Sequence, residues 1–196
     1  MNIVRSASPA SVYDEAMTGE GALAMLPLDE SPWLPLYTAA AAWIDDDEPV
    51  VDFGCGTGRF ADLLYRDGWR TAPYVGLDFS PATLDEARRT VSSPLVHWLH
   101  ADLERDSPPR LKHGAYVCLE VLEHLDDDCG LIGKLPAGSR LIMSVPSFES
   151  DTHVRWFDSL VDVLGRYGAL LDFTETVVLP VGDEGRVIYL ADTVRW

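Results

Sequence analysis

A glycine-rich loop between a short apolar run and a helical pattern most constrains the fold of this chain. Residues 50–60 read VVDFGCGTGRF, in which Gly54, Gly56 and Gly58 alternate with other residues directly after the apolar run. This arrangement is typical of a buried strand that turns sharply into a helix and exposes backbone to a ligand. The segment therefore predicts a nucleotide-type binding loop in an α/β sheet.

Details of the loop distinguish between ligands. The dinucleotide fingerprint is GxGxxG, whereas here Arg59 occupies the place of its last glycine. Asp52 precedes the first glycine of the loop, where a carboxylate favours an amino group over a pyrophosphate. Asp78 closes the next apolar run, a position from which a carboxylate can hold ribose hydroxyls. We expect both acids to face one adenosine-type ligand rather than NAD.

Four motifs in order carry a family resemblance. VVDFGCGTG at residues 50–58 and VGLDFS at residues 75–80 resemble the first two motifs of class I S-adenosylmethionine-dependent methyltransferases. HADL at residues 100–103 resembles the adenine-contacting motif of that family, and AYVCLEVLEHL at residues 115–125 resembles its fourth-strand motif. The resemblance covers about residues 50–146 and implies a Rossmann-like, seven-stranded, mostly parallel sheet with helices on both faces and a reversed final strand.

The pattern of the rest of the chain predicts the same architecture independently. Apolar runs alternate with helical patterns, which implies a parallel sheet covered on both faces. Two β-rich runs at residues 170–179 and 187–194 have no helix between them and predict an antiparallel C-terminal β-hairpin. The other expected strands are residues 50–53, 74–78, 95–99, 115–119 and 140–145, and the expected helices are residues 32–44, 59–67, 80–90 and 159–167.

We expect a single domain, because 196 residues with 47% hydrophobic content can bury one substantial core. Within it, residues 1–48 form an N-terminal cap or helical segment and residues 49–146 form the cofactor-binding core. Residues 147–196 supply an acceptor-side loop, a helix and the terminal hairpin.

Composition disfavours several classes of partner. The net charge is −17, with 15 basic against 32 acidic residues, and nucleic-acid binding depends on cations that neutralise phosphates. Cys55, Cys118 and Cys129 lack CxxC spacing, which predicts neither disulfides nor a zinc site. Neither a secretory signal nor an apolar stretch of about 18 residues is found, so we expect a cytoplasmic protein without a membrane partner.

The resemblance implies which residues bind S-adenosylmethionine. Asp52 would support the glycine loop, Asp78 would hold the ribose hydroxyls, and Phe79 would pack on the adenine. Asp102 would accept a hydrogen bond from the adenine amino group, unless it is simply a solvated acid at a strand end. The residues expected at the cofactor are Asp52, Gly54, Cys55, Gly56, Gly58, Asp78, Phe79, Ala101, Asp102, Leu103, Leu119 and Glu120.

Methyl transfer from a sulfonium needs alignment more than acid assistance, because a neutral thioether leaves. A base becomes useful when the acceptor is a hydroxyl, and histidine suits that task near neutral pH. His124 and His153 are the candidate bases. The family resemblance implies that Glu120 borders the reactive methyl group. We expect methylation of a small-molecule acceptor, at oxygen before nitrogen or carbon.

The segment EVLEH offers an alternative. Helical spacing would place Glu120, Glu123 and His124 on one face. The segment resembles the ExxEH of ubiquinone-pathway O-methyltransferases and of small-RNA 3′-terminal 2′-O-methyltransferases, which use a divalent ion, and His153 could complete such a magnesium site. The same motif occurs in metal-free relatives, where its side chains brace the loop after the fourth strand. The chain also has VPSF at residues 145–148 in place of the RNA branch's asparagine and phenylalanine signature.

Two further alternatives stay open. The chain could bind the cofactor without turnover, as a methyltransferase-like binding protein. His153, Arg155, Trp156 and Phe157 could line an acceptor pocket, or the aromatic residues could begin a buried helix while Arg155 pairs with an acid. The aromatic residues Tyr13 and Trp33 of the N-terminal region could close over the cofactor or serve only in packing.

Overall fold

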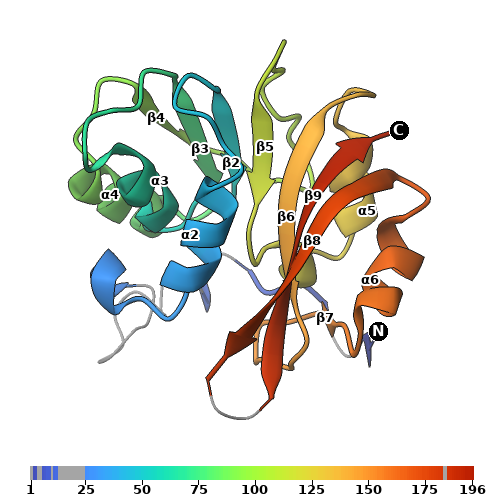
Figure 1. Cartoon of the computed structure of the whole chain (residues 1–196). Coiled ribbons are helices and arrows are strands. Elements are labelled where there is room, and N and C mark those ends of the chain that lie inside the picture. The colour runs from blue at the N-terminus through green and yellow to red at the C-terminus, as the bar shows by residue number, and fades with distance from the viewer. Residues whose placement is uncertain (1, 4–5, 10, 13–24, 183–184) are drawn as a thin grey trace.

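The structure is a computed structural model that describes residues 2–3, 6–9, 11–12, 25–182 and 185–196. Seven strands form its main sheet (Figure 1). These strands are β2 (Val50–Phe53), β3 (Tyr74–Asp78), β4 (Val96–His100), β5 (Ala115–Cys118), β6 (Arg140–Pro146), β8 (Leu171–Val181) and β9 (Arg186–Arg195). A second, two-stranded sheet pairs β1 (Asn2–Ile3) with β7 (Arg155–Trp156).

The helices lie mainly between the strands along the chain. The α-helices are α2 (Leu34–Ala41), α3 (Arg59–Tyr65), α4 (Pro81–Thr90), α5 (Asp128–Gly133) and α6 (Leu160–Tyr167), and the 3₁₀-helices are η2 (Leu28–Glu30) and η3 (Leu122–His124). Among the described helices, none has the length and apolar character needed to span a lipid bilayer.

The sheet has the strand order β4-β3-β2-β5-β6-β9-β8. Strands β4, β3, β2, β5 and β6 are parallel, β9 runs antiparallel to β6, and β8 runs antiparallel to β9. The predicted mostly parallel sheet with an antiparallel C-terminal hairpin is therefore confirmed. Because the chain moves outward from β2 to β4 and then returns to β5, the strand order reverses between β2 and β5. Ligand sites of open α/β sheets form at such a reversal.

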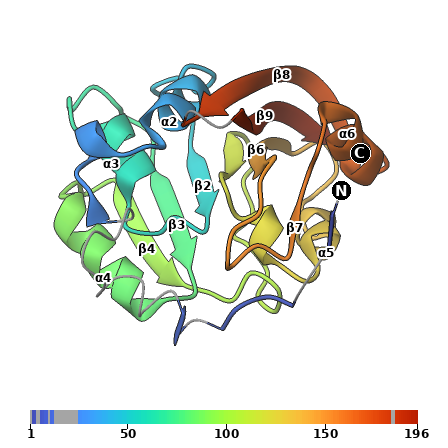
Figure 2. The ribbon, with the colours of Figure 1, turned by 90° about the horizontal axis from the view of Figure 1, so that it is seen from below.

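Alternation along the strands creates two cores. Side chains of successive strand residues point to opposite faces of a sheet, so Val50 and Val51 of β2 enter different clusters. The Val50 cluster includes residues of α2 and α3, and the Val51 cluster includes residues of α5 and α6. Figure 2 shows α2, α3 and α4 on one side of the sheet and α5 and α6 on the other. Cys118 belongs to the second cluster and is a free thiol, as are Cys55 and Cys129.

Capping residues set several helix boundaries. The Ser80 side chain accepts a hydrogen bond from the backbone N–H of Thr83, and Pro81 occupies the first turn of α4. The helix expected over residues 32–44 is shorter in the structure, and α5 was not predicted at all. Gly130 and Gly133 weaken the helical pattern of α5. It forms in a tertiary context that buries two of its apolar side chains.

A buried ion cluster ties α5 and α6 to the loop after β5. Asp128 accepts hydrogen bonds from Arg166 and Tyr167, and its Oδ2 lies 3.3 Å from Nη1 of Arg155. Burial alone would raise the pKa of Asp128, but these hydrogen bonds outweigh burial and hold the pKa below its usual value. Arg155 also donates to the carbonyls of Leu122 and Asp126. The alternative in which Arg155 pairs with an acid is therefore the observed one.

Asp128→Ala should destabilise the fold strongly, because it leaves the side chain of Arg155, which is 2% exposed, without its carboxylate. Breaking a buried ion pair costs about 3 to 5 kcal/mol. The matched control is Asp85→Ala, which removes the exposed partner of Arg88 and should change stability by less than about 1 kcal/mol. Urea unfolding of both variants measures the difference, and equal losses would contradict the role of the cluster.

Candidate active site

Two adjoining cavities lie at the carboxyl ends of the central strands. The larger has a volume of about 800 Å³ and the smaller about 170 Å³. They share Gly54, Gly56, Thr57 and Glu120. The larger is also lined by Ala7, Ser8, Pro9, Asp78, Phe79, Thr83, His100, Asp102, Leu103, Glu104, Arg105, Val121, His124, Leu125 and Asp126. The smaller is also lined by Ser31, Trp33, Tyr37, Cys55, Arg59 and Leu119.

The glycine loop exposes backbone where the cavities meet. Gly56 has a φ of 53°, and a Cβ atom placed on it would meet nothing within 4 Å. Gly58 has a φ of 79°, and a Cβ atom there would lie 2.9 Å from the ring of Trp98. Glycine is needed at both positions for the left-handed backbone. Gly56 keeps space open to a ligand, whereas Gly58 lets α3 and its neighbours pack closely.

Asp78 lies at the end of β3 and faces the larger cavity. One carboxylate oxygen accepts a hydrogen bond from the Gly56 N–H at 2.9 Å. The other accepts from the Ser80 N–H and the Thr83 hydroxyl, at 2.9 and 3.0 Å. Burial raises the pKa of Asp78, and these hydrogen bonds oppose the shift. The side chain thus positions the glycine loop and still borders the space that a ligand would fill.

Asp52 does not share that position. It is 3% exposed, accepts a hydrogen bond from the Tyr74 hydroxyl, and is absent from the described lining of both cavities. Burial raises the pKa of Asp52 to about 7, with the hydrogen bond from Tyr74 opposing and the charge of Asp78 adding to the shift. The expectation that both acids face one ligand is therefore wrong for Asp52, which lies beneath the loop because Tyr74 holds it there.

Glu120 follows β5 and lines both cavities. Its φ is 55°, the only positive value at a non-glycine residue in the described part of the chain. The Glu120 N–H donates to the Ser144 hydroxyl at 2.9 Å, and that hydroxyl donates to the Glu120 carboxylate at 2.8 Å. Burial raises the pKa of Glu120 to about 7, and the hydrogen bond from Ser144 opposes the shift. Strained backbone of this kind clusters at functional sites.

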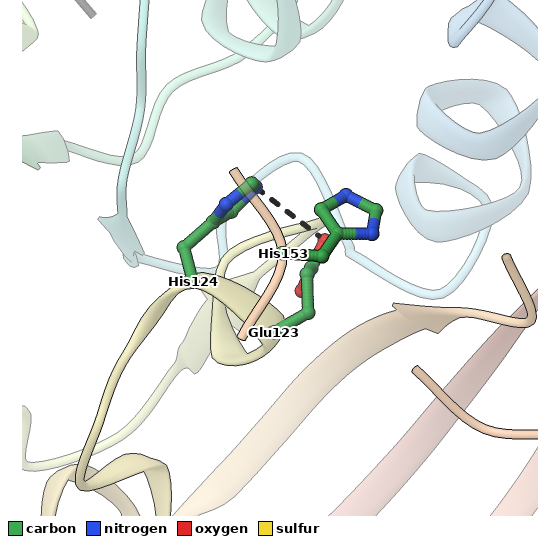
Figure 3. Close-up of side chains that lie close together, drawn as sticks. All are labelled: Glu123, His124 and His153. Carbon is green, nitrogen blue, oxygen red and sulfur yellow. Dashed lines mark ion pairs between the residues drawn. The ribbon is translucent and has the colours of Figure 1, made fainter. Parts of the chain in front are cut away.

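Glu123, His124 and His153 converge beside the larger cavity (Figure 3). Their potential ligand atoms all lie within 4.8 Å of one another. His124 lines the cavity, whereas His153 is absent from the described lining and Glu123 is fully buried. The proposed four-residue magnesium site is thus brought together only in part, because Glu120 does not belong to this cluster and is held by Ser144 instead.

The electrostatics of His124 limit its use as a base. Burial, together with the neighbouring His153, lowers the pKa of His124 to about 4. Its Nδ1 lies 3.1 Å from the Thr152 carbonyl oxygen. The ring is therefore uncharged near neutral pH and is a weaker base than an ordinary histidine.

The expected adenine-side residues divide between the cavity and its support. Phe79, Asp102 and Leu103 line the larger cavity, whereas Ala101 is absent from its described lining and donates its N–H to the Asp78 carbonyl. The Asp102 carboxylate accepts from the Glu104 N–H at 3.0 Å and lies 3.4 Å from Arg105.

Two more expectations about lining residues are settled in part. Trp33 lines the smaller cavity, while Tyr13 lies outside the described residues. Phe157 is fully buried in the core that includes α5 and α6, so it does not form an acceptor pocket.

Sequence reasoning missed several lining residues. The sequence predicts Tyr37 and Arg59 only as residues of expected helices, whereas both line the smaller cavity. Ser8 gave no signal, because its stretch has no periodicity. The Ala7 N–H donates to the Asp126 carboxylate at 2.8 Å, which holds this N-terminal stretch at the larger cavity. Figure 2 shows this N-terminal stretch in dark blue along the lower edge of the view.

Comparisons with solved structures identify the fold. The [4+2]-cyclase SpnF has the same fold, with a TM-score of 0.75 at 13% identity over 99% of this chain and 98% of that protein. The N-methyltransferase NodS from Bradyrhizobium japonicum WM9, in complex with S-adenosyl-L-homocysteine, gives a TM-score of 0.60 at 18% identity over 82% of this chain and 86% of NodS. The architecture is that of the class I S-adenosylmethionine-dependent methyltransferases.

The sequence of the core gives a second likeness. Residues 50–132 match the family described as "Methyltransferase domain". Trans-aconitate 2-methyltransferase of Azoarcus sp. (strain BH72) is 32% identical over 115 residues, which are 56% of this chain and 44% of that enzyme. The chain spans less than half of the length of this curated relative.

Replacing Asp52 should alter the pH dependence of stability. Burial raises the pKa of Asp52 in the folded protein to about 7. The contribution of Asp52 to stability is therefore fully present below about pH 4 and is lost as the pH rises through about 7. The loss amounts to at most about 4 kcal/mol. Asp52→Asn should remove it, so the free energy of unfolding should fall less between pH 4 and pH 8 than in the wild type. Urea unfolding at four pH values measures this. Exposed Asp45→Asn should keep the wild-type profile, and a parallel Asp52→Asn profile would contradict the assignment.

Proposed function

We propose that this protein transfers the methyl group of S-adenosylmethionine to an oxygen atom of a small-molecule acceptor. The observation that carries the proposal is the pair of cavities joined at the bare backbone of Gly56, where Asp78 lines the larger cavity and Glu120 lines both. The proposed roles of the chain segments are those expected from the sequence. Residues 49–146 bind the cofactor, and residues 1–48 and 147–196 contribute to the cap and the acceptor side.

In this proposal the larger cavity takes the adenosine. The Asp78 carboxylate accepts hydrogen bonds from the ribose hydroxyls, and Phe79 and Leu103 cover the adenine ring. Asp102 accepts from the adenine amino group after its side chain turns from Arg105. The larger cavity has a volume of about 800 Å³, which lies within the usual range of ligand pockets. This volume leaves space beyond a nucleoside for an acceptor.

The smaller cavity takes the amino-acid end of the cofactor. In its described lining, Arg59 is the only cation and Glu120 the only acid. A methionine moiety carries an ammonium and a carboxylate, so these two side chains complement its charges. Cys55 and Leu119 supply apolar surface near the sulfonium.

The transfer itself is a displacement at carbon. The acceptor oxygen forms the new C–O bond while the C–S bond breaks, and the electron pair of that bond remains on the sulfur of S-adenosylhomocysteine. The proton of a hydroxyl acceptor passes to Glu120 or to His124, two titratable groups that line the larger cavity. His153 acts through the ring of His124, 5.0 Å from its own.

The acceptor is best matched as a neutral or cationic molecule. The curated relatives are named for trans-aconitate, a tricarboxylate. Here, however, the described lining of the larger cavity carries several acids and a single arginine, Arg105. A polycarboxylate would be repelled by these acids. The overall charge of −17 likewise disfavours the RNA alternative. A cytoplasmic location remains part of the proposal.

Asp78→Asn should weaken binding of S-adenosylhomocysteine by about 10- to 100-fold, or roughly 1 to 3 kcal/mol, because hydrogen bonds to a charged group are lost. Isothermal titration calorimetry of the folded variant measures the change, and exposed Asp85→Asn on α4 serves as the control with unchanged affinity. Folded wild-type protein that binds neither S-adenosylmethionine nor S-adenosylhomocysteine would contradict the whole proposal.

Turnover can be tested with methyl-tritiated S-adenosylmethionine and a panel of phenols, aliphatic alcohols, trans-aconitate and a short RNA. We expect tritium transfer to a hydroxyl acceptor, and a reduced kcat for Glu120→Gln at saturating cofactor. Transfer only to RNA or to trans-aconitate would refute the proposed acceptor class. Cofactor binding without transfer to any acceptor would support a non-catalytic protein, or other chemistry on this fold, as in the cyclase.

A further inference from the structure

Among the described residues, the Glu123 carboxylate has no hydrogen-bond partner, although it lies in a buried environment that demands one. Its side chain is fully buried, and neither carboxyl oxygen has a hydrogen-bond partner among the described residues. The Nε2 atom of His124 lies 3.8 Å from Glu123 Oε1, beyond hydrogen-bonding distance. Buried polar side chains in native proteins are nearly always satisfied, so an orphan of this kind indicates a water or an ion at the site.

The two neighbouring histidines present the features of metal ligands. Nδ1 of His124 lies 3.1 Å from the Thr152 carbonyl oxygen, and Nδ1 of His153 lies 2.9 Å from the Phe148 carbonyl oxygen. A carbonyl accepts only from a protonated nitrogen, so these contacts place the lone pair of each ring on Nε2. Backbone carbonyls commonly orient metal-bound histidines in this way.

The backbone holds the two segments of this cluster together. The Val154 N–H donates to the Glu123 carbonyl at 2.7 Å, so the loop that carries His153 is hydrogen-bonded to η3, which carries Glu123 and His124. The buried Arg155 donates to the Leu122 carbonyl from the same loop. These bonds fix the spacing of the three side chains before any ligand arrives.

We propose that Glu123, His124 and His153 bind one divalent transition-metal ion, with Zn²⁺ as the best match. Two imidazoles and one carboxylate form a nitrogen-rich donor set, which suits zinc and its neighbours better than magnesium. Zinc bonds of about 2.0 to 2.2 Å place tetrahedral donor atoms about 3.4 Å apart. One potential ligand atom of each residue lies within 4.8 Å of the other two, so the side chains must rotate to close on an ion.

The site has a consequence for the acceptor, which rests on the proposed function. Three protein ligands leave one tetrahedral position for a further ligand, and His124 places the cluster at the wall of the larger cavity. A hydroxyl acceptor bound to the ion loses its proton more readily, because the ion stabilises the alkoxide. Because Nε2 of His124 would hold the ion, the proton of the acceptor would then pass to Glu120, which lines the same cavity.

Metal binding is tested on the full chain after treatment with a chelator and dialysis, without cofactor. Calorimetric titration with Zn²⁺ should give one equivalent, and Co²⁺ should give the visible absorption bands of a tetrahedral site. His153→Ala and Glu123→Gln should each weaken Zn²⁺ binding by at least about 100-fold, since each removes a direct ligand and outer-shell losses alone reach about 10- to 100-fold.

Two control variants make the test selective. His97→Ala removes an exposed histidine on β4 and should leave Zn²⁺ affinity unchanged. Glu120→Gln should also leave it unchanged, because Glu120 lies outside the three-residue cluster. Wild-type protein that binds S-adenosylhomocysteine but no stoichiometric Zn²⁺ would overturn the metal site while sparing the proposed function.

The remaining outcomes are also decisive. Loss of Zn²⁺ binding in Glu120→Gln, or selective binding of Mg²⁺, would overturn the three-ligand transition-metal site. If His153→Ala does not fold, as judged by near-ultraviolet circular dichroism, Glu123→Gln and the Co²⁺ spectrum of the wild type decide the question.

Discussion

The structure depends on the parallel pairing of β2 with both β3 and β5. This pairing brings the carboxyl ends of three central strands to one edge, where the chain continues into the glycine loop, Asp78 and Glu120. None of these groups is near the others in sequence, yet Asp78 hydrogen-bonds to Gly56 and all three line the larger cavity. The site therefore follows from strand order, and the loops only complete it.

A charged cluster between α5 and α6 holds the segment around η3 beside the site. Asp128, Arg155 and Arg166 form a buried charged cluster that joins α5 and α6 to the segment around η3. Because Arg155 donates to the Leu122 and Asp126 carbonyls, the same cluster fixes the segment that carries Glu123 and His124. A buried ion pair is weak evidence for net stability. Here its more evident role is to fix one conformation of the loop.

Much of this arrangement could be predicted from local sequence, and the failures have a common physical cause. The glycine loop, Asp78 and the C-terminal hairpin carry strong local signals in residue type and spacing. The orientation of Asp52 depends on Tyr74, which is 22 positions away on the next strand. The conformation of Glu120 depends on Ser144 in the same way, 24 positions away. Spacing along one chain does not reveal which side chains meet across a sheet.

The conformation of Glu120 has a thermodynamic consequence. Its backbone adopts a left-handed φ, and reciprocal hydrogen bonds to Ser144 restrict both the main chain and the side chain. The Glu120 side chain therefore loses its conformational entropy when the protein folds and not when a ligand binds. Ordering a long side chain during association opposes binding by about 0.5 to 1.5 kcal/mol. A ligand that binds in either cavity therefore contacts a Glu120 side chain that is already ordered.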